Sequence, residues 1–135
     1  MTNKPESDSI VTDTPYQQLG GEAAIRQLVN AFYDRMEASA EADELRGMHA
    51  TDLSPMRQTL FEFLSGWLGG PRHYFERANA KCIMSAHAAL TINRRVADQW
   101  LMCMRHALQT VDAPDDTRAF IDNAFTRVCN AMVNR

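Results

Sequence analysis

The chain has 135 residues, of which 45% are hydrophobic, and its 14 basic and 17 acidic side chains give a net charge of −3. This length corresponds to one domain, and the hydrophobic content suffices for a folded core. Nucleic-acid binding requires a basic surface, so we expect no nucleic-acid partner. The longest uncharged stretch, residues 82–93, is too short and too polar to span a bilayer, so we expect no membrane partner.

The first 14 residues are polar, and we expect residues 1–14 to form a flexible leader and residues 15–135 to form a single domain. The N-terminus has no apolar segment typical of a secretory signal. The cysteines, Cys82, Cys103 and Cys129, are odd in number and irregularly spaced. This pattern favours free thiols in a reducing compartment, so we expect a cytoplasmic protein.

From Tyr16 onwards the apolar spacing is helical, and no strand alternation is visible. Gly20 and Gly21 separate a short helical turn, residues 16–19, from a longer helix. The inner face of the longer helix carries Ile25, Leu28, Val29, Phe32 and Met36. A further short helical piece is expected over residues 43–48.

The next helix is expected to start with Ser54 as N-cap and Pro55 as first helical residue, because proline lacks the N–H that would have no partner there. Its apolar stripe is Met56, Leu60, Phe63, Leu64 and Trp67. The Gly-Gly-Pro sequence at residues 69–71 is expected to end it. Residues 71–80 predict an extended loop that is long for a helical bundle. Such a loop stays ordered if it wraps a ligand that supplies part of the core.

The second half of the chain predicts a short helix over residues 81–88 and two long helices. The first long helix opens near Asn93, and Asp112 and Pro114 start the second. The inner face of the first carries Val96, Trp100, Met104 and Leu108. The inner face of the second carries Phe120, Ile121, Ala124, Phe125, Val128 and Met132. The fold class is therefore all-α, with four substantial helices.

His87 stands among small and apolar residues, without the acidic or hydroxyl cluster of a catalytic triad or a zinc cage. A neutral imidazole in an apolar wall suits a metal whose other ligands are not protein, and haem iron is such a metal. Trp100 follows thirteen positions later, inside the next predicted helix. Taken alone, a histidine on an apolar face is more often an ordinary core residue, and the same holds for Trp100.

Taken together, these features resemble the group II truncated haemoglobins. The matching residues are Gly20-Gly21, Phe32-Tyr33, Gly69-Gly70-Pro71, Tyr74, His87-Ala88, Leu90, Ile92 and Asp98-Gln99-Trp100-Leu101. They extend from about Tyr16 to the last helix. The resemblance implies a truncated globin-like two-over-two helical sandwich around one haem b, iron protoporphyrin IX.

The resemblance also implies roles for single residues. His87 corresponds to the proximal iron ligand, and Tyr33, His49 and Trp100 correspond to residues that stabilise a ligand on the distal side. Met56 falls where longer globins carry a distal histidine. The other implied cofactor-binding residues are Met56, Leu60, Phe63, Leu64, Trp67, Arg72, Tyr74, Met84, Leu90, Ile92 and Val96.

One departure from the family pattern affects the haem propionates. The basic residues that often precede the proximal histidine are replaced by Met84, Ser85 and Ala86. Candidate propionate partners that remain are Arg57, Arg72, His73 and Tyr74.

The chemistry of ferrous haem explains these residue types. One neutral nitrogen binds the iron, and the other ring nitrogen of His87 is expected to donate to a carbonyl, with that of Ile83 as the candidate. Dioxygen bound to ferrous iron acquires negative charge, so the donors Trp100, Tyr33 and His49 would slow its escape. Each hydrogen bond to a charged acceptor contributes roughly 1.5–3 kcal/mol. Two such bonds would therefore slow ligand loss on the order of a hundredfold or more.

We therefore expect a haem protein that binds O2, CO or NO at ferrous iron and is served by a reductase, with oxygen binding or transport as its first role. NO dioxygenase or peroxidase-like activity is an open addition, and no catalytic residue is assigned. Tyr33 or His49 as a resting-state iron ligand is a subsidiary hypothesis. The alternatives are a non-haem all-α interaction domain and a haem-based gas or redox sensor that acts through a partner. Zinc is disfavoured, because no repeated Cys-x-x-Cys spacing is present.

Overall fold

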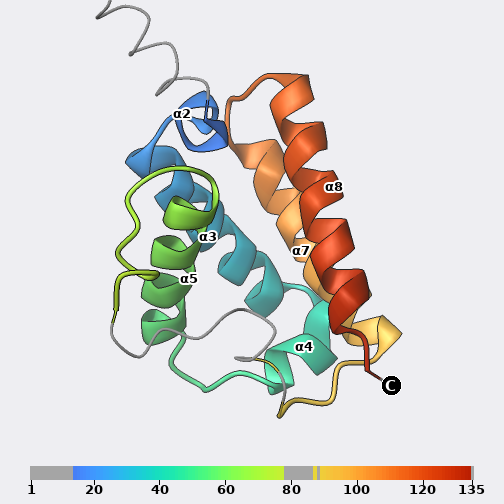
Figure 1. Cartoon of the computed structure of the whole chain (residues 1–135). Helices are drawn as coiled ribbons and strands as arrows, with labels where there is room; N and C mark the ends of the chain where they lie inside the picture. Colours follow the sequence, from blue (N-terminus) through green and yellow to red (C-terminus); the bar gives the residue numbers. More distant parts are fainter. Residues whose placement is uncertain (1–13, 78–86, 88, 135) are drawn as a thin grey trace, which may run out of the picture.

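The structure, a computed structural model, describes residues 14–77, 87 and 89–134. Its elements are α2 (Pro15–Leu19), α3 (Glu22–Ala38), the 3-10 turn η1 (Ala40–Ala42), α4 (Asp43–Gly47), α5 (Ser54–Trp67), α7 (Arg94–Thr110) and α8 (Asp115–Met132). In the described residues every regular element is helical, and α3, α5, α7 and α8 are the four substantial helices that the spacing predicts. Figure 1 shows α7 and α8 side by side as one pair and α3 and α5 as the other.

Two sequence-based expectations fall largely outside the described residues. The leader, residues 1–14, is described only at Thr14, whose side-chain oxygen accepts the Gln17 N–H at 3.1 Å and caps α2. The helix expected over residues 81–88 is described only at His87, which is helical. The leader and this short helix therefore stay predictions.

Helix α3 is the centre of the fold, packed against both α5 and α7. Its predicted inner face is confirmed: Ile25, Leu28 and Val29 have no exposed surface, and Phe32 and Met36 are buried as well. Tyr33, which the stripe did not include, is also buried, with 2% of its surface exposed. The break before α3 is confirmed too, because Gly20 and Gly21 both have positive φ.

The start of α5 differs from the prediction by one residue. Ser54 is the first helical residue and Leu53 is the N-cap, with no side-chain cap bond. Asp52 takes the role expected of Ser54, because its Oδ1 accepts the Ser54 N–H at 3.0 Å. A carboxylate there also interacts favourably with the positive end of the helix dipole. Pro55 lies in the first turn, as expected.

The predicted stripe of α5 is only partly buried, although Leu64 is 1% exposed. Met56 is 39% exposed, and Trp67 is half-buried. The residues fully covered by neighbouring elements include Phe61 and Ser65, which the stripe did not contain. The stripe is only partly buried because it borders a cavity.

Helix α7 is confirmed from its start, because the Asn93 side chain accepts the Val96 N–H at 2.8 Å as N-cap. Helix α8 begins after Pro114, and its inner face contains Ile121 and Phe125 as expected. Phe120 was predicted to lie inward, and this is wrong, because it is 58% exposed. The buried positions of α8 follow a four-residue step, Thr117, Ile121, Phe125 and Cys129. Phe120 directly precedes Ile121, so its side chain points about 100° away from this buried line around the helix axis.

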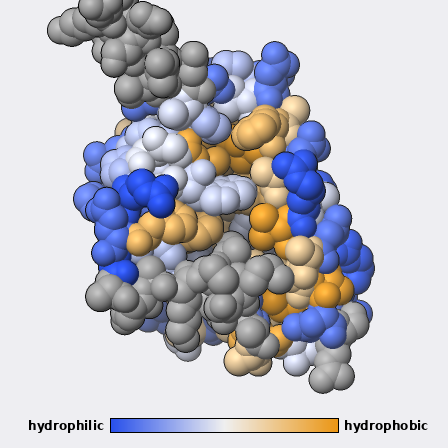
Figure 2. All heavy atoms as spheres, viewed as in Figure 1, coloured by the Kyte–Doolittle hydropathy of each residue, from blue (hydrophilic) through white to orange (hydrophobic). Residues whose placement is uncertain are grey.

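The face of the molecule seen in Figure 2 shows where the apolar surface lies. Hydrophobic residues gather between α5 on one side and α8 on the other, and polar residues cover both flanks. Among the described helices, none combines the length and the apolar character that crossing a membrane would require.

Gly70 packs directly against the ring of the buried Tyr16, and this contact yields a stability prediction. A Cβ atom at Gly70 would lie 2.5 Å from Tyr16 Cδ1, closer than van der Waals contact. We expect Gly70→Ala to lower the free energy of unfolding by about 1–3 kcal/mol, the usual effect of overpacking. Gly47→Ala is the matched control, because no described atom outside its own helix lies within 4 Å of a Cβ there. Urea unfolding curves that shift equally for both variants would contradict this account.

Candidate functional site

A cavity of about 450 Å³ is lined by residues of α5, α7 and α8, with Tyr33 contributed by α3 and Leu45 by α4. This volume is within the range of roughly 300–1,000 Å³ that small-molecule sites occupy. Among the described residues the lining is mainly aliphatic and aromatic and contains no Asp, Glu, Lys or Arg. Its residues are Tyr33, Leu45, Met48, His49, Ala50, Met56, Thr59, Leu60, Phe63, Leu64, Trp67, Tyr74, His87, Leu90, Ile92, Val96, Ala97, Trp100, Phe125, Val128, Cys129 and Met132.

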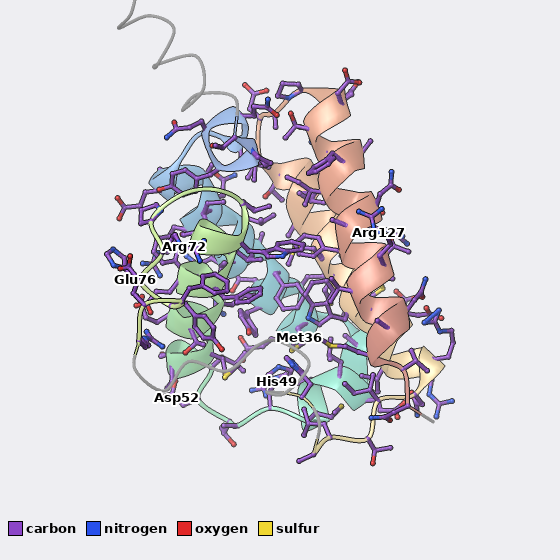
Figure 3. The ribbon with its side chains drawn as sticks, in the orientation of Figure 1. Met36, His49, Asp52, Arg72, Glu76 and Arg127 are labelled. Atoms are coloured by element: carbon purple, nitrogen blue, oxygen red, sulfur yellow. The ribbon has the colours of Figure 1, made fainter. Side chains whose placement is uncertain are left out.

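The structure brings nearly all the predicted site residues to this one cavity. Of those described, only Arg72 is absent from the lining. Arg72 is exposed, and its guanidinium carbon lies 5.0 Å from the ring centre of Phe75. Figure 3 shows it on the flank of α5, away from His49. Met84 lies outside the described residues, and its role stays a prediction.

Sequence reasoning missed several lining residues on α4, α5, α7 and α8 and in the segment after α4. They are Leu45, Met48, Ala50, Thr59, Ala97, Phe125, Val128, Cys129 and Met132. For Phe125, Val128 and Met132 the available signal was the apolar stripe of the last helix, which was interpreted as ordinary core. A stripe does not show whether it faces another helix or a cavity.

A chain of aromatic rings orients the polar side chains at one end of the cavity. Phe32 contacts Tyr33 on one side, at 4.9 Å between ring centres, and Trp100 on the other, at 5.1 Å. Trp100 meets Phe125 edge-on at 5.2 Å, and Phe125 stacks on Trp67 at the same separation. Such pairs prefer defined edge-to-face or offset geometries, so the indole and phenol groups are held in fixed directions.

Tyr33 keeps its phenolic proton. Burial raises the pKa of Tyr33 to about 12, and the positive charge of Arg57 lowers it only in part. The Arg57 guanidinium carbon lies 5.6 Å from the centre of the Tyr33 ring. At neutral pH the hydroxyl is therefore a hydrogen-bond donor at the cavity wall.

His49 has its tautomer set by the backbone. Its Nδ1 lies 2.9 Å from the Leu45 carbonyl oxygen. A carbonyl oxygen only accepts, so Nδ1 carries the proton and Nε2 of the neutral ring carries a lone pair. The sequence-based expectation that His49 donates to a bound ligand therefore changes: in its neutral form the free ring nitrogen accepts. The ring centres of His49 and Tyr33 are 6.0 Å apart.

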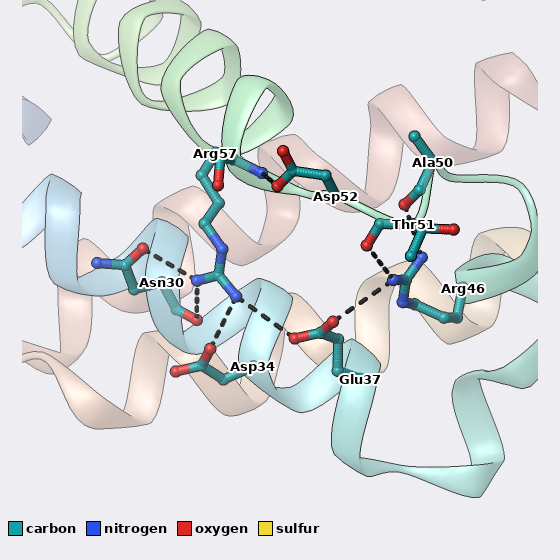
Figure 4. Close-up of polar contacts among 9 residues, drawn as sticks. Asn30, Asp34, Glu37, Arg46, Ala50, Thr51, Asp52 and Arg57 are labelled. Atoms are coloured by element: carbon teal, nitrogen blue, oxygen red, sulfur yellow. Dashed lines mark hydrogen bonds and ion pairs between the residues drawn. The ribbon is translucent and has the colours of Figure 1, made fainter.

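The loop after His49 is held from outside the cavity by Arg46. The two terminal nitrogens of Arg46 donate to the carbonyl oxygens of Ala50, at 3.0 Å, and Thr51, at 2.9 Å. Arg46 also pairs with Glu37 of α3 at 3.4 Å (Figure 4). Exposed ion pairs contribute little individually, but the two carbonyl bonds fix the path of the chain that follows His49.

Arg57, a candidate propionate partner, is engaged with α3 and not with the cavity. It donates to Asn30 Oδ1 at 3.0 Å and to Asp34 Oδ1 at 2.9 Å (Figure 4). Glu37, which also pairs with Arg46, lies 3.7 Å from the same guanidinium. These contacts tie α5 to α3 across the end of the cavity.

Helix α4 is fastened to the beginning of α7 by polar contacts. The side-chain oxygen of Gln99, the residue before Trp100, accepts the Leu45 N–H at 2.9 Å. Glu44 accepts from Asn93 at 3.1 Å and from Arg95 at 2.6 Å. The hydrogen bond from Arg95, followed by that from Asn93, lowers the pKa of Glu44. These contacts hold α4, which carries the Leu45 carbonyl, against α7, which carries Trp100.

The polar groups of the lining fit an iron porphyrin. His87 is half-buried at the cavity, and Tyr33, His49 and Trp100 add a phenol, a second imidazole and an indole. Within the described part of the chain, no group of three or more His, Cys, Asp or Glu side chains could hold a metal ion. An apolar cavity with imidazoles but without such a ligand group suits a metal that brings most of its ligands with it, as haem iron does.

Comparison with known proteins identifies the family. The family model described as bacterial-like globin matches residues 14–134. The chain is 30% identical over 123 residues to the group 2 truncated hemoglobin YjbI of Bacillus subtilis, covering 91% of this chain and 90% of that protein.

Solved structures give the same answer. The cold-adapted truncated hemoglobin of the Antarctic marine bacterium Pseudoalteromonas haloplanktis TAC125 is 36% identical, with a TM-score of 0.87 and coverage of 91% of this chain and 99% of that one. The group II 2-on-2 hemoglobin of the plant pathogen Agrobacterium tumefaciens is 31% identical, with a TM-score of 0.85 and coverage of 90% and 94%. The chain therefore belongs to the bacterial-like globin family, among its group II truncated haemoglobins, with their two-over-two fold and with haem b as cofactor.

Proposed function

We propose that this chain binds dioxygen reversibly at ferrous haem iron, with His87 as the protein ligand of the iron. The observation that carries the proposal is the shared cavity: His87, Tyr33 and Trp100 all line one apolar space. Bound haem would supply an iron atom with one open position for a diatomic gas, so CO and NO are further ligands. The apolar wall excludes water from that position.

Trp100 and Tyr33 are the donors in this proposal. The indole N–H of Trp100 has no acceptor function, so it can only donate. The Tyr33 hydroxyl remains protonated because burial raises its pKa. A hydrogen bond to a charged acceptor contributes roughly 1.5–3 kcal/mol, enough to slow ligand release by on the order of ten- to a hundredfold.

His49 modulates Tyr33 in this proposal. The phenol has one proton to donate, and the neutral His49 ring offers an acceptor nitrogen in the same cavity. The bound gas and His49 therefore compete for the Tyr33 proton, while no such competitor is assigned to Trp100. For this reason we assign Trp100 the larger share of ligand retention.

Slow release favours a redox role over rapid delivery of oxygen. Conversion of nitric oxide and reduction of peroxide are the two such roles we propose. Conversion of nitric oxide to nitrate by the oxygenated form would leave the iron ferric, so it requires a reductase that returns the iron to the ferrous state. Reduction of peroxide to water requires a donor of two electrons. A reducing cytoplasm suits this chemistry. It also suits Cys103 and Cys129, which are free and buried, with thiol pKa values raised by burial to about 11.

The alternatives differ in what they ask of this cavity. A non-haem interaction domain conflicts with membership of a globin family. A haem-based sensor would use the same cavity and the same His87, and it differs only in needing a partner protein that responds to the state of the haem.

The first prediction concerns His87. We expect His87→Ala to lose the Soret absorption of the purified protein, because His87 is the proposed proximal ligand and His49 is assigned to the distal side. His106→Ala is the control, because His106 is exposed on α7 and outside the cavity lining. Ultraviolet–visible spectra of the ferric, ferrous and CO forms measure both. A His87→Ala spectrum identical to wild type in all three forms would refute the assignment.

The second prediction ranks the two donors. We expect Trp100→Phe to raise the O2 dissociation rate by on the order of ten- to a hundredfold, the effect of one lost bond to a charged acceptor. Tyr33→Phe should raise it less, because His49 competes for the phenolic proton. Both substitutions keep an aromatic ring beside Phe32. Stopped-flow displacement of O2 by CO measures the rates, and the reverse ranking would contradict the assigned roles.

The third prediction follows from the Tyr33 pKa of about 12. The raised pKa means that the folded state favours the neutral phenol, so this contribution to stability is complete below the unfolded pKa of about 10 and is lost as pH rises above it. Between the unfolded pKa of about 10 and the folded pKa of about 12, the wild type should lose roughly 1.4 kcal/mol of unfolding free energy per pH unit relative to Tyr33→Phe. Urea unfolding at increasing alkaline pH tests this, and parallel stability curves would disprove it.

A further inference from the structure

The last described residue of the chain bonds to the segment that follows His87. Helix α8 ends at Met132, Val133 is extended, and Asn134 then lies beside residues 90–92. In Figure 1 the C-terminus lies next to the chain that leads into α7. Helix α8 therefore brings Asn134 to the connection between His87 and α7.

Asn134 makes three hydrogen bonds to this segment. Its Oδ1 accepts the Ile92 N–H at 2.8 Å, and its Nδ2 donates to the Leu90 carbonyl at 2.9 Å. Its backbone N–H donates to the Ile92 carbonyl at 2.8 Å. The partners fix the orientation of the side-chain amide, because a backbone N–H only donates and a carbonyl only accepts.

These bonds reach His87 by one further step. The Leu90 N–H donates to the His87 carbonyl at 3.0 Å. Leu90 and Ile92 both line the cavity, and Ile92 is 7% exposed. The segment is not part of a helix or strand, so its backbone groups have no ladder of regular hydrogen bonds, and Asn134 makes three bonds to them.

The other end of the segment has an independent anchor. Asn93 caps α7 and also donates to Glu44 of α4. The beginning of α7 therefore does not depend on Asn134. What depends on Asn134 is the part of the segment nearer His87.

We propose that Asn134 is a positioning residue for His87: by clamping residues 90–92, it holds the imidazole in the orientation in which it binds haem iron. The inference rests on the proposed assignment of His87 as the iron ligand. It gives the C-terminus a part in tuning the proximal side of the haem, through the chain that carries the ligand. Removing the two side-chain bonds should increase haemin loss by on the order of tenfold.

The test compares haem-loaded Asn134→Ala, Asn134→Asp and Asn130→Ala with wild type. Asn134→Asp keeps an acceptor for the Ile92 N–H but turns an oxygen towards the Leu90 carbonyl, so it should disturb the segment at least as much as alanine. Asn130→Ala is the matched control, since Asn130 accepts only from the exposed Arg94 among the contacts described. The readouts are the iron–histidine stretching band of the ferrous protein in resonance Raman spectra and the rate of haemin transfer to an excess of an acceptor apoglobin.

We expect both Asn134 variants to shift or broaden the band and to lose haemin faster, while Asn130→Ala matches wild type. A variant with a lower melting temperature but a wild-type band and a wild-type rate would make Asn134 merely structural and overturn the proposal. A separate His87→Gly variant, measured with and without added imidazole, tests the iron ligand itself. If the iron–histidine band of His87→Gly matches wild type without imidazole, the assignment of His87 as iron ligand is wrong. If the band is lost and added imidazole restores an iron–imidazole band, that assignment holds, and a negative result for the Asn134 variants contradicts only the role of Asn134.

Discussion

The fold depends on a space that its own side chains do not fill. A cavity of about 450 Å³ runs between α5 and the α7–α8 pair, and its wall is mainly apolar. An unfilled interior void loses packing contacts, and proteins tolerate such voids poorly. An apolar ligand that completes the core would explain the half-buried stripe of α5, with Trp67 at its end. A flat macrocycle bound through His87, as we propose, would meet that requirement and become part of the structure.

The rest of the architecture keeps the cavity walls in place from its edges. At the distal end, Arg46 holds the loop after His49, and Gln99 ties α4 to α7. At the proximal side, Asn134 holds the segment after His87. These polar contacts are made by residues outside the described cavity lining, so they fix geometry without placing charge in it. The His49 ring is oriented by the Leu45 carbonyl, and the segment after His87 is held by Asn134.

The positions of the long helices and many residues of the cavity lining could be predicted from the sequence, because apolar stripes and motif residues are local patterns. The stripe of α3 and the cap at Asn93 are examples. Predictions failed where the answer depended on contacts distant in the chain. The exposure of Phe120 follows from the rotation of α8 against its neighbours, and the bonds of Asn134 join residues more than forty positions apart. The acceptor role of His49 is set by a carbonyl, which no pattern of side chains reports.

The most direct test of the central claim is the stability of the haem-free protein before and after titration with haemin. A ligand that completes the core binds only the folded state, and at a concentration a thousandfold above its dissociation constant it adds about 4 kcal/mol to the free energy of unfolding. The account predicts a saturable stabilisation of that order at one haemin per chain, together with a Soret band that reaches its maximum at the same ratio. An unfolding transition that does not move on addition of haemin would contradict it.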